Sequence, residues 1–101
     1  MSAKGYLIAE AKVTDPVVYE HYKALAEVAI AGHGGRYLVR GGAAEILEGG
    51  WSPRRLVVVE FESVEQAKTF YQSAAYRAAR EARAGAAEMN MMVVSGIDNP
   101  V

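Results

Sequence analysis

The sequence predicts an α+β fold in which helices cover one face of a four-stranded antiparallel sheet. Strand-like and helix-like segments follow one another in the order strand, helix, strand, strand, helix, strand, and glycines separate several of them. This order is the split βαβ or ferredoxin-like βαββαβ arrangement. A chain of 101 residues has room for one hydrophobic core. We therefore expect residues 1–101 to form a single domain.

The first strand is expected over Tyr6–Val13, because apolar and polar side chains alternate there. Asp15 and Pro16 open the first helix, since aspartate accepts hydrogen bonds from the first turn and proline is tolerated at the first helical position. The glycines within Gly32–Gly35 end it. Three- and four-residue spacing predicts the buried stripe of this helix: Val18, Tyr22, Leu25, Val28 and Ala29.

The second strand is expected over Arg36–Arg40, and the glycine pair Gly41–Gly42 indicates a β-bulge. A hairpin loop at Gly49–Pro53 leads to a third strand over Arg54–Phe61. Because strand side chains alternate, one face of the second strand would carry two charges. The residues on this face are Arg36, Leu38 and Arg40.

The second helical segment begins at Ser63, which forms a capping box with Gln66. It bends or restarts at Gln72–Ser73, and its alanine-rich second half continues to Gly85. The last strand covers Met89–Gly96.

Both faces of the expected sheet carry apolar residues, but two helices cover only one of them. The second face holds Tyr6, Ile8, Leu38, Leu56 and Val58. Leaving each side chain exposed forgoes roughly 1.5 to 3 kcal/mol, and the sum of about 10 kcal/mol rivals the stability of a small domain. We therefore predict a homodimer closed sheet against sheet, with Trp51, Tyr6 and Leu38 as candidate interface residues.

Charged residues of the second face are expected to meet inside this dimer. A hairpin about Gly49–Gly50 would place Arg40 opposite Glu60 and Glu45 opposite Arg55. Arg40, Glu60 and Glu10 would then form a polar cluster in an apolar interior. The cluster could fix strand register by neutralising its own charges. It could also line a ligand pocket between the subunits, where Arg40 would orient a carbonyl, phenolate or carboxylate group.

Three further side chains are candidates for a ligand site. His21 lies beside the buried stripe of the first helix, where it could act as a general base or simply pack. Tyr71 and Tyr76 flank the bend at Ser73 and could close a pocket or fill the core. If the protein is an enzyme, Arg40 would stabilise negative charge, and the proton carrier would be His21, Glu60 or Glu10.

Composition argues against several other functions. The net charge of −1 gives no field for nucleic acid or membrane surfaces, so neither partner is expected. The third strand also lacks the stacking aromatics of RNA-recognition domains. The absence of cysteine agrees with a cytoplasmic location. His21 and His33 lack the spacing of a helical zinc pair, so no metal is predicted, and no cofactor is expected.

Four stretches, GGRYLVRGG, EGGWSPRR, VVVEFES and FYQSAAY, resemble the domain-of-unknown-function family 1330 from Gly5 to about Gly96. The resemblance implies a dimeric α+β barrel. The sequence departs from the family pattern at Glu62 and at Ala74–Ala75. It matches characteristic family positions at Gly34, Gly35, Arg36, Arg40, Gly41, Gly42, Trp51, Glu60, Phe61, Tyr71, Ser73 and Tyr76.

The leading functional hypothesis is a homodimer that binds a small organic molecule in the cavity between its sheets. Cofactor-free monooxygenases and isomerases occur in other branches of the superfamily, so the resemblance makes these the candidate enzyme classes. The alternatives are a non-catalytic ligand sensor and a purely structural dimer, because fold alone does not transmit chemistry.

Overall fold

The structure is a computed structural model that describes residues 3–98. Residues 1, 2 and 99–101 of the expected 1–101 domain lie outside the described residues. The elements follow the expected order, with the second helical segment divided in two. Their bounds are β1 Gly5–Val13, α1 Pro16–Gly32, β2 Arg36–Arg40, β3 Arg55–Phe61, α2 Val64–Gln72, α3 Ala74–Ala82 and β4 Ala87–Ser95.

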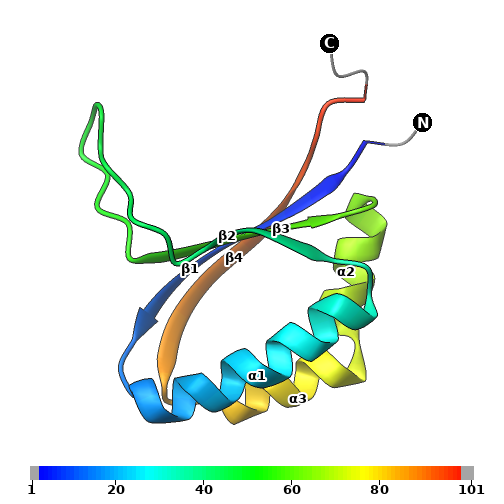
Figure 1. Cartoon of the computed structure of the whole chain (residues 1–101), viewed down its shortest axis with the longest axis horizontal. Helices are drawn as coiled ribbons and strands as arrows, with labels where there is room; N and C mark the ends of the chain where they lie inside the picture. Colours follow the sequence, from blue (N-terminus) through cyan, green and yellow to red (C-terminus); the bar gives the residue numbers. More distant parts are fainter. Residues whose placement is uncertain (1–2, 99–101) are drawn as a thin grey trace.

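The strands form one sheet in the order β2-β3-β1-β4, and each neighbouring pair is antiparallel. All three helices lie on one face of this twisted sheet, and α1 runs beside α3 (Figure 1). The predicted ferredoxin-like α+β fold is therefore confirmed. Within residues 3–98, no helix is both long enough and apolar enough to cross a membrane.

Local hydrogen bonds explain where the helices begin. Asp15 Oδ1 accepts from the backbone N–H of Val18 at 3.2 Å, and Ser63 Oγ accepts from that of Gln66 at 3.0 Å. Ser73 ends α2 and caps α3, as the predicted bend requires. The capping box is only half formed, because the Gln66 side chain donates instead to the carbonyl of His33 at 2.9 Å. This bond ties the start of α2 to the end of α1.

The hydrophobic core lies between the helices and the sheet. Phe70 is fully buried at its centre, with its ring centroid 4.5 Å from that of Tyr76 and 5.2 Å from that of Phe61. The buried stripe of α1 differs in part from the prediction and consists of Tyr19, Tyr22, Ala26, Ala29 and Ile30. Val28 is 72% exposed, because the two tyrosines rather than the valines face the sheet.

A β-bulge in β2 reverses the expected direction of Arg40. Tyr37 pairs with Val59 and Val39 with Val58, so Leu38 is an extra residue without a partner in β3. Beyond the bulge each side chain moves to the opposite face. Arg40 therefore lies opposite Val57 and points toward the helices. The predictions of a bulge at Gly41–Gly42 and of Arg40 opposite Glu60 were wrong.

The face of the sheet away from the helices, here called the far face, is open in the single chain. Apolar side chains remain exposed on it, including Met92 at 59% and Val94 at 43%. Between β2 and β3, residues 41–54 project beyond the sheet as an arm (Figure 1). Trp51, in this arm, is 80% exposed.

Candidate functional site

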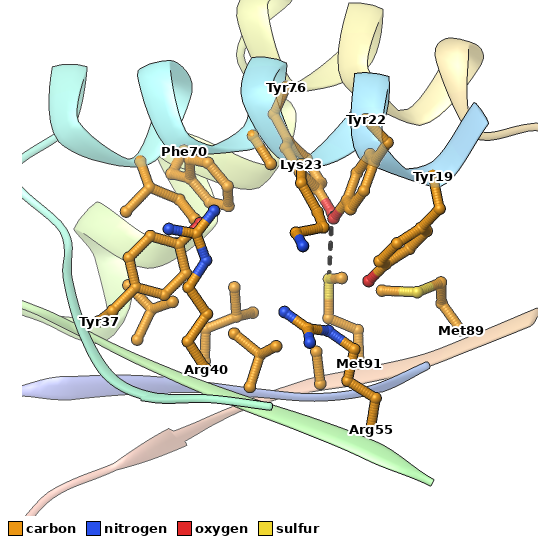
Figure 2. Close-up of a pocket in the computed structure, with 16 residues that line it drawn as sticks. Tyr19, Tyr22, Lys23, Tyr37, Arg40, Arg55, Phe70, Tyr76, Met89 and Met91 are labelled. Carbon is orange, nitrogen blue, oxygen red and sulfur yellow. Dashed lines mark hydrogen bonds between the residues drawn. The ribbon is translucent and has the colours of Figure 1, made fainter. Parts of the chain in front are cut away.

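A pocket lies between the sheet and the helices, on the side opposite the far face (Figure 2). We call it the helix-side pocket. Its interior has a volume of about 40 Å³ and is mainly apolar. The polar groups that reach it come from both layers: Tyr19, Tyr22 and Lys23 from α1, Tyr76 from α3, Tyr37 and Arg40 from β2, and Arg55 from β3.

Two tyrosine hydroxyls form a hydrogen-bonded pair in this pocket. The hydroxyls of Tyr22 and Tyr76 are 2.7 Å apart, and the Tyr76 hydroxyl lies 3.8 Å from the sulfur of Met91. Because the thioether can only accept, a chain from Tyr22 through Tyr76 to Met91 uses both hydroxyl protons. A lone pair of the Tyr22 oxygen is then left to accept from a ligand.

Burial keeps the Tyr22 side chain neutral. Removal of the phenolate from water is the largest cause that raises the pKa of Tyr22 far above that of an ordinary tyrosine, and the neighbouring Tyr76 raises it further. Burial also raises the pKa of Tyr37, although the Arg40 guanidinium 4.4 Å from its ring centroid opposes the shift. The Tyr22 hydroxyl is therefore a hydrogen-bonding group rather than a base.

Three cations, Lys23, Arg40 and Arg55, line both this pocket and an outer hollow of about 410 Å³, and we call the boundary that they share the neck. Lys23 Nζ is 3.0 Å from a carboxylate oxygen of Glu20, and Arg40 Nη1 is 3.2 Å from one of Glu27. The third cation, Arg55, has no carboxylate within 4 Å among residues 3–98. Its Nε is buried and lacks a hydrogen-bond partner in the described part of the chain.

The expected cluster of Arg40, Glu60 and Glu10 does not form, because the bulge turns Arg40 to the helix side. Glu60 instead accepts from Arg36 Nη2 at 2.8 Å and from the Tyr6 hydroxyl at 3.3 Å. The pairing of Arg36 with Glu60 follows directly from the strand register.

Glu10 has separate partners at the other end of β1. It accepts hydrogen bonds from the backbone N–H of Arg54 and from the Asn90 side chain, both at 3.1 Å. The bond from Arg54, followed by that from Asn90, lowers the pKa of Glu10. Glu10 is thus held as a carboxylate at the rim of a far-face hollow of about 360 Å³, which Trp51 also lines.

Among the remaining candidates, Tyr76 lines the helix-side pocket and His21 does not. His21 is exposed on α1. Tyr71 is half-buried outside the pocket, where its hydroxyl accepts from Arg80 Nη1 at 3.2 Å. Leu38, a candidate interface residue, is 47% exposed at the bulge.

Sequence reasoning missed Arg55 and Lys23 as pocket residues. Arg55 was expected to pair with Glu45 across a longer hairpin, but β2 ends at Arg40 and no such pairing forms. Its direction was nonetheless readable, because Arg55, Val57 and Val59 alternate onto one face of β3. No group of three or more histidine or acidic side chains is placed to hold a metal ion within residues 3–98.

Solved structures with the same fold come from several bacteria. A protein of unknown function from Rhodopseudomonas palustris has a TM-score of 0.74 and 15% identity, with 98% of this chain and 86% of that chain covered. SnoaB, a cofactor-independent oxygenase from Streptomyces nogalater, has a TM-score of 0.68 and 9% identity, with 97% of each chain covered. A dimeric ferredoxin-like protein of unknown function from Bacteroides fragilis NCTC 9343 has a TM-score of 0.62 and 15% identity, with 91% of this chain and 95% of that chain covered. At these identities the similarity shows the fold alone.

No curated protein matches the sequence. A family model described as a domain of unknown function, DUF1330, matches residues 4–97. This range covers the sheet, the helices and the helix-side pocket, and it confirms the resemblance seen in the sequence motifs. The chain therefore belongs to the DUF1330 family.

Proposed function

We propose that this protein is a homodimer that binds a small organic molecule in the helix-side pocket of each subunit. The observation that carries the proposal is the convergence of the Tyr22–Tyr76 hydroxyl pair and the three neck cations on a mainly apolar cavity. A few polar groups in an apolar concavity are the usual features of a small-molecule site. The inter-sheet location expected from the sequence required Arg40 on the far face, and Arg40 lies on the other side.

The dimer is supported by the exposed apolar side chains of the far face. Met92 is exposed there, whereas its cross-strand partner Ile8 and the adjacent Val58 on β3 are half-buried. A second copy placed on this face would remove these side chains from water, which favours association. The fold neighbour from Bacteroides fragilis is described as dimeric.

The pocket supports binding better than acid–base catalysis. Among the described residues its interior is lined by neither a carboxylate nor an imidazole, and the Tyr22 phenol stays neutral. The expected proton carriers His21, Glu10 and Glu60 lie elsewhere. SnoaB is a cofactor-independent oxygenase, but a shared fold does not transmit its chemistry. The cytoplasmic location stays a prediction.

The size of the helix-side pocket limits how much of a ligand can enter it. The interior of about 40 Å³ accommodates only a few atoms, since one water needs about 10 to 15 Å³ on this scale. A larger portion of the ligand fits the outer hollow of about 410 Å³. The site therefore suits a molecule that inserts one short end between the sheet and the helices.

Native mass spectrometry of protein purified from its own cell tests the proposal. The expected result is a dimer that retains a small molecule. Val57→Phe should lose that molecule by filling the pocket, whereas Val28→Phe makes the same change on exposed α1 and should keep it. Retention of the molecule by a folded, dimeric Val57→Phe variant would contradict the proposal.

A further inference from the structure

We infer that the ligand is an organic monocarboxylate whose acid group binds Arg55 at the neck of the helix-side pocket. The inference deepens the proposed function and rests on it. Within residues 3–98, three arginines have a buried Nε without a hydrogen-bond partner: Arg55, Arg80 and Arg83. Of these three, Arg55 differs in that no aromatic ring faces its guanidinium in the described part of the chain.

The compensating groups of the other arginines are specific. Arg40 has Glu27 at 3.2 Å and the Tyr37 ring at 4.4 Å. Arg80 also has a buried Nε without a partner, but its guanidinium lies 4.4 Å from the Tyr71 ring centroid and donates to that hydroxyl. Arg83 lies 5.3 Å from the ring centroid of Tyr22. Within residues 3–98, neither an acidic partner nor a facing ring accompanies Arg55.

The surrounding backbone leaves space for the Arg55 side chain. Gly41 adopts φ +73°, and a Cβ atom at this position would collide with the Arg55 guanidinium. The Gly41 N–H donates to the carbonyl of Leu56 at 2.7 Å, which fixes this close approach. On the neighbouring strand the residue opposite Arg55 is Ala11, whose small side chain adds no bulk. The Arg55 guanidinium thus packs closely against the backbone at Gly41, beside the neck.

Among residues 3–98, the lack of an acidic partner indicates the kind of group that Arg55 binds. The Nε atom is itself shielded from solvent, so a ligand would approach the two Nη groups, which can donate in parallel to one carboxylate. The Arg55 side chain is half-buried, so water screens its charge only in part, and an acid that occupies this position is favoured by electrostatics as well as by geometry.

The net charge of the residues around the neck matches a ligand that carries a single negative charge. Lys23, Arg40 and Arg55 are balanced by two carboxylates, Glu20 and Glu27, so one positive charge remains. A monocarboxylate neutralises it, whereas a phosphate dianion would leave an excess of negative charge. Arg55 extends from β3 toward the tyrosine hydroxyls (Figure 2), so the short end of the same ligand can reach them.

Two pairs of probes test the inference: butyrate with butyramide, and benzoate with benzamide. Each pair has nearly the same shape but differs in charge. Methyl NMR of Met89, which lines the helix-side pocket, reports occupancy, and Met92 on the far face is the internal control. We expect the acids to bind at least tenfold more tightly than the amides and to shift Met89 but not Met92.

Substitutions at Arg55 separate its role from a general electrostatic effect. Arg55→Gln should remove the preference for acids. Arg55→Lys keeps the charge but loses the paired donors, so it should weaken benzoate binding at least fivefold. The matched control is Arg54→Gln, one residue away and exposed, and it should change binding less than twofold. The lysine variant also keeps the test decisive if the glutamine variant fails to fold.

Three outcomes would overturn the inference. If acids and amides shift Met89 with equal affinity, the proposed pocket stands and the acid specificity is wrong. If Arg54→Gln weakens binding as much as Arg55→Gln, the preference arises from the overall charge. If neither acid nor amide shifts Met89, both this inference and the proposed function fail.

Discussion

The two faces of the sheet differ in how completely one chain covers them. On the helix side, Val59, Phe61, Phe70 and Tyr76 are at most 1% exposed, and the core closes around a narrow pocket. On the far face, Met92 is 59% exposed and neighbouring apolar side chains also remain open. Burial of apolar surface is the main force that stabilises a fold. The helix side therefore has the properties of a packed hydrophobic core, and the far face has those of a protein–protein interface.

The largest effect is expected from a truncation on the helix side. Phe70→Ala should lower the free energy of unfolding by about 3 to 5 kcal/mol, because it leaves a cavity among Phe61 and Tyr76. Urea denaturation would measure the loss. A loss below about 1 kcal/mol would mean that this side is not the tightly packed core of the molecule.

A charge on the far face should act on association rather than on folding. Met92→Lys should weaken the proposed dimer by about 100-fold or more, since symmetry introduces the lysine twice into an apolar interface. Analytical ultracentrifugation would follow the change in mass. Val28→Lys, on exposed α1, is the control and should leave the dimer intact. Equal dissociation of both variants would place the interface elsewhere.

The tyrosine pair offers a smaller and pH-dependent test of the helix side. Tyr22→Phe should cost about 1 to 2 kcal/mol, because the Tyr76 hydroxyl oxygen loses the hydrogen bond from Tyr22 and keeps only its contact with Met91. Burial raises the pKa of Tyr22, so its contribution to stability is complete below the unfolded pKa of about 10. It is lost as the pH rises further, because the unfolded state then ionises first.

Thermal denaturation between pH 8 and pH 11 measures this dependence. Wild-type stability should decrease above about pH 10, and the decrease should be shallower in Tyr22→Phe. Parallel curves for the two proteins would show that Tyr22 ionises equally readily in the folded and unfolded states.

The smallest effect is expected at the ion pair between Arg36 and Glu60. The Arg36 side chain is 71% exposed, so Arg36→Gln should cost less than about 1 kcal/mol in the single chain. Chemical denaturation at low protein concentration would test this value. A cost of several kcal/mol would mean that the pair is already shielded from water without a partner.

Local sequence signals were sufficient for most of the fold. Alternation along β1 placed Tyr6 and Ile8 on the second face, and the residues between and after them, Leu7, Ala9 and Ala11, are buried on the helix side. Asp15, Ser63 and Ser73 marked helix starts through side-chain hydrogen bonds to nearby amides, which depend on few distant contacts.

The candidate site depended on features that alternation does not reveal. One extra residue at Leu38 places Arg40 on the opposite face of the sheet. The ligand site predicted between the sheets therefore lacks its central residue. The stripe of α1 was also misassigned in part, because valine and tyrosine are both apolar enough to be buried. Only packing against the sheet selects Tyr19 over Val18.

A crystal structure of the protein grown with butyrate would test the central claim most directly. We predict butyrate density between the sheet and the helices, with the carboxylate on Arg55 and the short alkyl chain toward Tyr22. Density in the far-face hollow beside Glu10 and Trp51, enclosed by the second subunit, would contradict it.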